Sequence, residues 1–170
     1  MKMSSLPARY LTEEELGQLA GEVAEQPDLW SSEVAYSSDH RHYSSIYRDE
    51  FLDVWLLCWT RANDTGWHDH DVSSGAVRVV RGALRESRPR IGGEPAEAIV
   101  ADGGSLRFGP DHIHRLTGEA EQSVSIHAYS PPLSRLGQYT IDENGVLHRV
   151  SVSYAEELRP LGETAPADAA

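Results

Sequence analysis

Residues 66–75 read GWHDHDVSSG and contain two histidines, His68 and His70, one residue apart. On a β-strand, positions i and i+2 face the same side, so this pair can offer two neighbouring nitrogen ligands to one metal ion. The same spacing also occurs on solvated strand faces, and an isolated pair is more often of that kind. Motifs elsewhere in the sequence are needed to decide between a metal site and a polar strand face.

The composition favours a single turn-rich β domain. The chain has 170 residues, a length sufficient for one domain with a core of its own. Its hydrophobic fraction is 39%, and its 14 Gly and 9 Pro indicate many turns. The net charge of −12 argues against a nucleic-acid partner or an anionic membrane. The one cysteine, Cys58, excludes an internal disulfide, and no apolar run reaches the roughly 18 residues of a membrane span. We therefore expect a cytoplasmic monomer.

A helical segment is expected over about residues 10–30. Thr12 and Glu15 have the spacing of a capping box, and Pro27 is expected to stop the helix. Between them, apolar residues recur with the period of one helix face: Leu16, Leu19, Ala20, Val23 and Ala24. This segment precedes the β-rich part of the chain.

Strand patterns continue from about residue 45 to 155. They occupy residues 53–61, 75–87, 96–110, 123–132 and 137–154, the last with an Asn144-Gly145 hairpin turn. At least six short strands with few helices indicate a small β-barrel or sandwich. We expect one domain over residues 1–160 and a disordered tail over residues 161–170.

The segment SVSIHAYSPP (123–132) alternates strictly. Val124, Ile126 and Ala128 face one way, whereas Ser123, Ser125, His127 and Tyr129 face the other. A polar set of this kind on one face of a strand can be structural or catalytic, and the alternation alone does not distinguish the two.

Three pairs among the eight histidines have the i, i+2 spacing: 40/42, 68/70 and 112/114. His40 and His42 have no strand pattern around them and are interpreted as surface residues. His148, near the expected hairpin, is interpreted as structural.

Two longer stretches resemble the paired motifs of the cupin superfamily. After His68-x-His70 come four residues, Gly75 in the place where cupins usually carry glutamate, six residues, and Gly82. The stretch GGSLRFGPDHIHRL (103–116) resembles the second motif and supplies His114. The resemblance implies a mainly β fold, a cupin-type (jelly-roll) barrel preceded by a small N-terminal helical segment. Three histidines would then lie on the inner face of one barrel.

Residues 123–132 also resemble a signature of the cysteine dioxygenase family, the thiol dioxygenases among the cupins. The resemblance covers about residues 45–155 and implies that His68, His70 and His114 bind Fe(II). His112 is the alternative third ligand, but the family's histidine is followed directly by arginine, as His114 is by Arg115.

The same resemblance implies the other roles in the site. Ser125, His127 and Tyr129 would form a hydrogen-bonded relay that reaches the iron. Arg48 would grip the substrate carboxylate, for which a guanidinium has suitable bidentate geometry, with Tyr47 beside it. Trp59 would line the substrate pocket.

Further positions complete the comparison with the family. Animal members carry a cysteine at the position of Gly75, which forms a thioether with the relay tyrosine. Gly75 cannot form it, so we expect no crosslink at Tyr129. Cys58 is expected to pack in the core, and the Ser130-Pro131 bond is expected to be cis.

The function implied is oxidation of L-cysteine by O2 to cysteine sulfinic acid. One alternative is a dioxygenase of 3-mercaptopropionate or another small thiol acid, which would hold the carboxylate differently. The other is a cupin that binds a metal without catalysis. A zinc hydrolase is disfavoured because no glutamate is positioned as a general base near the three histidines.

Overall fold

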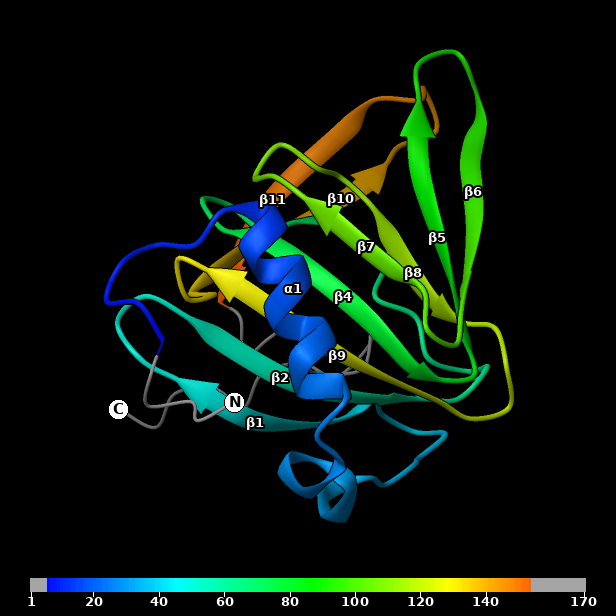
Figure 1. The fold of residues 1–170 in the computed structure, drawn as a ribbon. Coiled ribbons are helices and arrows are strands. Elements are labelled where there is room, and N and C mark those ends of the chain that lie inside the picture. Colours follow the sequence, from blue (N-terminus) through cyan, green and yellow to red (C-terminus); the bar gives the residue numbers. More distant parts are fainter. Residues whose placement is uncertain (1–5, 154–170) are drawn as a thin grey trace, which may run out of the picture.

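The computed structural model describes residues 6–153, a barrel of strands with one α-helix across its outer surface (Figure 1). Among the described residues the first element is α1 (Glu13–Ala24), followed by the 3-10 helices η2 (Pro27–Leu29) and η3 (Ser31–Glu33). The Thr12 hydroxyl accepts from the Glu15 backbone N–H and the Glu15 side chain accepts from the Thr12 N–H, which confirms the capping box. No helix among residues 6–153 is long and apolar enough to cross a bilayer.

Eleven strands follow within the described residues. They are β1 (His42–Arg48), β2 (Asp53–Trp59), β3 (Trp67–Asp69), β4 (Ser74–Arg81), β5 (Ala83–Arg90), β6 (Gly93–Ala101), β7 (Ser105–Phe108), β8 (Arg115–Gly118), β9 (Ser123–Ser130), β10 (Arg135–Ile141) and β11 (Leu147–Ser153). His42 opens β1, so the expectation that it stands outside any strand is wrong. Pairing with β2 supplies the strand order that the serine-rich local sequence does not suggest.

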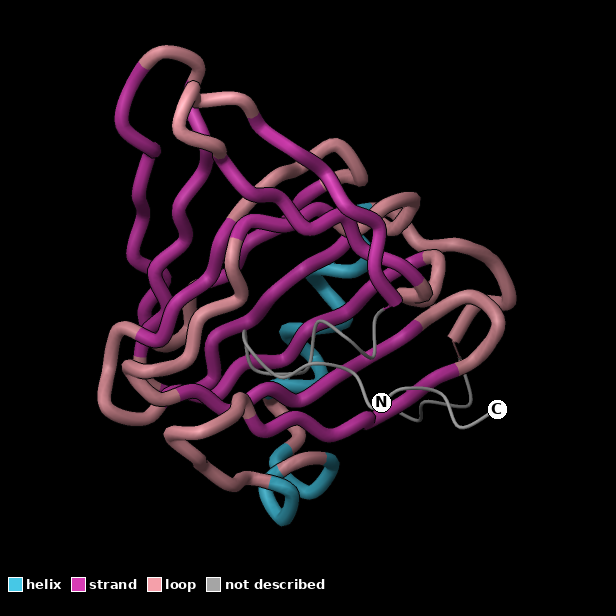
Figure 2. The backbone as a smooth tube through the Cα atoms, turned by 180° about the vertical axis from the view of Figure 1, so that it is seen from behind, coloured by secondary structure: helices cyan, strands magenta, loops and turns pink. Residues whose placement is uncertain are grey.

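The strands form the two faces of a mainly β, jelly-roll barrel (Figure 2). One face is a five-stranded sheet in the order β1-β2-β9-β4-β7. The other face contains two three-stranded sheets, β11-β10-β3 and β6-β5-β8. An antiparallel bridge between His68 and His114 joins these two sheets. The barrel predicted from the sequence is therefore confirmed, and the bridge lies where the histidines meet.

The alternation of β9 separates two cores. Val124, Ile126 and Ala128 pack on the outer side of the five-stranded sheet, against the apolar face of α1. Tyr129 belongs instead to the core inside the barrel, which also contains Trp59. The prediction that β9 presents two chemically different faces is therefore confirmed. The helix covers the apolar face and leaves the polar face to the interior.

The C-terminal hairpin turns where the sequence predicts. β10 and β11 pair in antiparallel fashion, from Ile141 opposite Leu147 beside the turn to Arg135 opposite Ser153. In the turn, Gly145 takes the left-handed conformation with φ of +77°. β10 pairs on its other edge with the short strand β3. The hairpin therefore supports the strand that carries His68 and leads directly into His70. The tail expected over residues 161–170 lies outside the described residues.

Candidate metal centre

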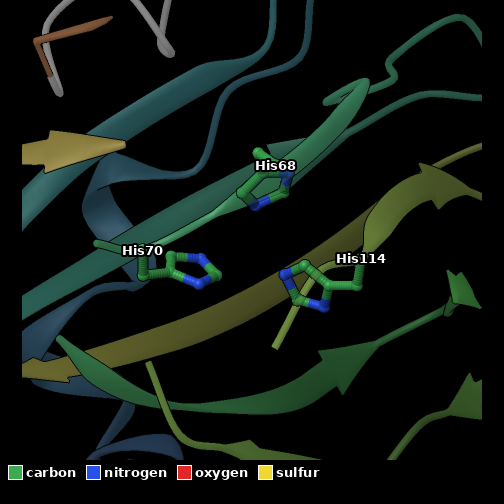
Figure 3. Close-up of side chains that lie close together, drawn as sticks. All are labelled: His68, His70 and His114. Atoms are coloured by element: carbon green, nitrogen blue, oxygen red, sulfur yellow. The ribbon is translucent and has the colours of Figure 1, made fainter. Parts of the chain in front are cut away.

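Three histidines from two separate segments meet inside the barrel. His68 lies in β3 and His70 directly after it, and His114 directly precedes β8. The backbone N–H of each of His68 and His114 donates to the carbonyl oxygen of the other, at 2.9 and 3.0 Å. All three side chains are buried, and one ring nitrogen of each lies within 4.8 Å of the others. Figure 3 shows the three rings gathered around one shared space.

The hydrogen bonds of these imidazoles leave lone pairs for a metal. His68 Nδ1 lies 3.1 Å from the Gly66 carbonyl oxygen and His114 Nδ1 lies 3.1 Å from a Glu86 carboxylate oxygen, so both nitrogens donate. Within residues 6–153, His70 Nδ1 and His114 Nε2 are buried without a hydrogen-bond partner. Burial lowers the pKa of His114 to about 3 and that of His70 well below its usual value. Neutral, buried imidazoles of this kind fit a divalent transition metal.

Asp69, between the two ligand histidines, points away from them and holds their strand in place. Its carboxylate accepts from the Gly137 N–H at 3.0 Å and the Tyr139 hydroxyl at 2.5 Å. It also accepts two hydrogen bonds from the Arg149 guanidinium, at 2.7 and 2.9 Å. Burial opposes ionisation, but the bonds from Arg149 and Tyr139 hold the pKa of Asp69 well below its usual range. The acid therefore attaches the ligand strand to both strands of the C-terminal hairpin.

A hydrogen-bonded chain runs along the inner face of β9 beside the histidines. Trp59 Nε1 donates to Ser125 Oγ at 2.8 Å, and Ser125 Oγ lies 2.8 Å from His127 Nε2. His127 Nδ1 lies 3.1 Å from the Tyr129 hydroxyl. The Tyr129 ring lies 5.2 Å from the ring of His70, centre to centre. The structure thus brings the three predicted relay residues together next to the three-histidine cluster.

Arg48 and Tyr47 bind acidic residues of their own neighbourhood. Arg48 donates to Asp53 at 2.5 Å and to the Leu133 carbonyl oxygen at 3.3 Å, and its side chain is 38% exposed. The Tyr47 hydroxyl donates to Asp49 at 2.7 Å. Asp53 is buried, so the guanidinium of Arg48 neutralises a charge that has no access to water.

Arg41 directly precedes β1 and is a second arginine on the inner side of the sheet, over Trp59, and it was not singled out from the sequence. It is 6% exposed, and its guanidinium carbon lies 4.8 Å from the centre of the Trp59 ring. Burial lowers the pKa of His127 well below its usual value, and the charge of Arg41 lowers it further. Arg41 is therefore the arginine whose charge reaches the relay.

The bulge in β1 explains why counting along the sequence misses Arg41. Strict alternation back from Arg48 selects Ile46, Ser44 and His42 as its neighbours on the same face. The register instead shifts between Ser45 and Tyr47, which restores Arg41 to the inner face. The local sequence of this serine-rich segment does not predict the register shift, which is defined only by the pairing with β2.

Phe108 occupies the space that a side chain at position 75 would need. A Cβ built on Gly75 would lie 2.4 Å from a Phe108 ring carbon and 3.1 Å from a Tyr129 ring carbon. The Phe108 ring stacks on His70, with centres 4.6 Å apart, and contacts His114 at 4.9 Å. Glycine at position 75 therefore makes room for an aromatic ring that packs directly on two of the candidate metal ligands.

We expect Gly75→Cys to destabilise the fold by about 1–3 kcal/mol, as overpacking of a tight core does. Denaturant unfolding measures this loss, and intact mass reports whether two hydrogens are lost in a thioether to Tyr129. Gly21→Cys is the control, because a Cβ on Gly21 meets nothing within 4 Å. Wild-type stability together with a thioether in Gly75→Cys would contradict the overpacking argument.

Two smaller expectations also hold. The Ser130-Pro131 peptide bond is cis. Cys58 is buried beneath α1 in the outer core, and burial raises the pKa of its thiol. A buried thiol of raised pKa is a packing group rather than a nucleophile.

Comparison with known proteins agrees with this geometry. The family model described as Cysteine dioxygenase type I matches residues 18–142. The chain belongs to the cysteine dioxygenase type I family. Cysteine dioxygenase type 1 of Danio rerio is 25% identical over 133 residues, which are 70% of this chain and 65% of that relative. The chain thus spans less than two thirds of the length of this relative.

Solved structures place the family member among the cupins by fold. A Klebsiella pneumoniae protein with a double-stranded β-helix domain is 12% identical, with a TM-score of 0.52, covering 70% of this chain and 91% of its own. A cupin superfamily protein of Desulfitobacterium hafniense is 7% identical, with a TM-score of 0.52, covering 60% and 87%. Similarity at this level of identity establishes the double-stranded β-helix fold and nothing about the reaction.

Proposed function

We propose that this family member is an Fe(II)-dependent dioxygenase that oxidises L-cysteine to cysteine sulfinic acid. In the overall reaction the thiol R–SH and one O2 give R–SO2H, so both oxygen atoms end on sulfur. The observation that carries the proposal is the conjunction of a buried, neutral three-histidine site with a tyrosine-ended hydrogen-bonded chain beside it. A site that only bound a metal would not require a phenol held against its ligands.

Iron is the metal proposed for His68, His70 and His114. Bound Fe(II) would supply the redox chemistry and favour a thiolate ligand, since three neutral imidazoles leave its charge uncompensated. His68, His70 and His114 would hold the metal through three ring nitrogens, and the substrate thiol and O2 would be its other ligands.

The relay gives the Tyr129 hydroxyl a defined direction. An indole N–H only donates, so Ser125 Oγ accepts from Trp59 and its own O–H is free to donate to His127 Nε2. His127 then carries its proton on Nδ1 and donates it to the Tyr129 oxygen. The Tyr129 oxygen thus accepts from His127, and its own O–H is a donor that would stabilise charge developing on the reacting oxygen.

Tyr129→Phe is expected to lower kcat on the order of 10²–10³-fold, as loss of one preorganised hydrogen-bond donor does. Metal content is expected to stay at the wild-type level, because the hydroxyl bonds the relay residue His127. Steady-state O2 uptake and metal analysis measure the two effects. Tyr10→Phe, on the exposed N-terminal side, is the control. A kcat within twofold of wild type would remove Tyr129 from the proposed mechanism.

Arg41 is our candidate for the group that binds the substrate carboxylate. Trp59 would line the pocket beneath the Arg41 guanidinium. Its guanidinium lies over the Trp59 ring, and its charge acts on the relay histidine. Arg48 is the alternative anchor, with Tyr47 beside it. Asp53 and Trp59 are six residues apart in β2, about 20 Å of extended strand, so the two arginines stand at opposite ends of the barrel wall.

The first experiment is O2 uptake by Fe(II)-loaded protein with L-cysteine and, separately, with 3-mercaptopropionate, with identification of the product. Uptake with L-cysteine and formation of its sulfinate would support the proposal. Preference for 3-mercaptopropionate would retain the reaction type and replace the substrate. No uptake with either thiol would overturn the dioxygenase proposal and favour a metal-binding cupin without this activity.

A further inference from the structure

Glu86 is a buried acid directly behind the metal site. It lies in β5, opposite Leu116 of β8, and its side chain is 6% exposed. A carboxylate at that depth requires hydrogen-bond donors to remain ionised. His112 Nε2 lies 2.8 Å from its Oε1 atom, and His114 Nδ1 lies 3.1 Å from the same atom. Two histidines from one His-x-His pair thus meet a single oxygen.

Those two contacts fix the roles of the two histidines. An ionised carboxylate only accepts hydrogen bonds, so both ring nitrogens donate to it. The proton of His114 is then on Nδ1, and its Nε2 carries the lone pair. That Nε2 atom is buried and has no hydrogen-bond partner within the part of the chain that the structure describes. His112 meets the same oxygen from a partly exposed position: its side chain is 23% exposed, and its ring lies 4.9 Å from that of His114, centre to centre.

We propose that Glu86 is a positioning residue that sets the tautomer and ring orientation of His114 for the metal, and that His112 holds Glu86. A carboxylate behind a ligand imidazole raises its basicity and fixes its orientation, which strengthens metal binding. The three candidate ligands differ in this respect. His68 Nδ1 donates to the neutral Gly66 carbonyl oxygen, and His70 Nδ1 has no hydrogen-bond partner among residues 6–153.

The arrangement also gives the His112-x-His114 pair a role that needs no fourth metal ligand. Glu86, His112 and His114 could themselves gather a metal ion, because their donor atoms lie within 4.8 Å of one another. That alternative would take the Nδ1 lone pair of His114, whereas the inner site takes Nε2. We assign His114 to the inner site because His68 and His70 supply two further buried nitrogens there.

The test is a Co(II) titration of metal-free protein, followed by visible absorption and by competition with a chelator. Glu86→Gln is expected to raise the Kd about 10- to 100-fold, as loss of a carboxylate behind a ligand histidine does. His112→Gln retains a donor for Glu86 and is expected to have a smaller effect, below about 10-fold. The control is Glu97→Gln, an acid of the neighbouring strand that pairs with Arg85 and Ser87.

Two further readouts separate positioning from simple support of the fold. Denaturant unfolding of the metal-free variants measures their stability, and ¹⁵N NMR of histidine-labelled protein reports the His114 tautomer. A Kd within twofold of wild type in folded Glu86→Gln would overturn the proposal. If the wild type binds a second Co(II) equivalent that Glu86→Gln or His112→Gln loses, the proposal is also overturned. The cluster of Glu86, His112 and His114 would then itself be a metal site. Neither outcome depends on the dioxygenase activity.

Discussion

His114→Ala is expected to abolish metal retention. A structural metal site contributes about 10–16 kcal/mol, so one ligand of three accounts for several kcal/mol, on the order of 10³-fold or more in Kd. The loss is expected to be large because His114 joins the two segments that form the site. Its backbone pairs with His68, and its side chain completes the buried cluster.

Metal analysis after purification and dialysis measures this result, with His68→Ala as a second variant. His148→Ala is the matched control, because His148 is an exposed histidine that bonds Asp142 on the C-terminal hairpin. Circular dichroism establishes that the variants remain folded. Wild-type metal stoichiometry in folded His68→Ala and His114→Ala would mean that the metal centre lies elsewhere.

Arg41→Gln is expected to lower kcat/KM for thiol acids on the order of 10- to 100-fold, chiefly through a higher KM. Hydrogen bonds to a charged group contribute about 1.5–3 kcal/mol, and Gln keeps a donor but loses the charge. Arg41→Lys keeps the charge and loses the planar fork, so its effect is expected to be intermediate. Steady-state kinetics with a carboxylate thiol and with cysteamine, which has no carboxylate, measure the effect.

Arg48→Gln is the matched comparison. Because Arg48 pairs with the buried Asp53, this variant is expected to lower the Tm while leaving KM near the wild-type value. A reversed pattern, with the KM effect in Arg48→Gln and none in Arg41→Gln, would assign the anchor to Arg48. An equal effect of Arg41→Gln on both thiols would contradict a carboxylate-binding role for Arg41.

Much of the site could be predicted because its signals are local. Strand alternation alone puts Ser125, His127 and Tyr129 on one face, and the i, i+2 spacing does the same for His68 and His70. Resemblance to the family supplied His114, whose partner segment is more than 40 residues away in the chain. The structure brings these six residues together as expected.

The residues that were missed depend on contacts between distant segments. Arg41 reaches the inner face through a bulge that only the pairing of β1 with β2 defines. The sequence around Glu86 is that of an ordinary strand glutamate. Its proposed role depends on contacts with His112 and His114, which are 26 and 28 residues further along the chain. Phe108 gains its importance from the missing side chain at Gly75. Periodicity carries no information on any of these contacts.

The attachment of the ligand strand to the C-terminal hairpin has a consequence for biosynthesis. β3 pairs with β10, and Asp69 is bound by Tyr139 and Arg149, which are among the last described residues to be translated. A nascent chain that has exposed both histidine segments but not this hairpin lacks the contacts that hold β3 in place. We therefore expect stable metal acquisition to follow the pairing of this hairpin with β3.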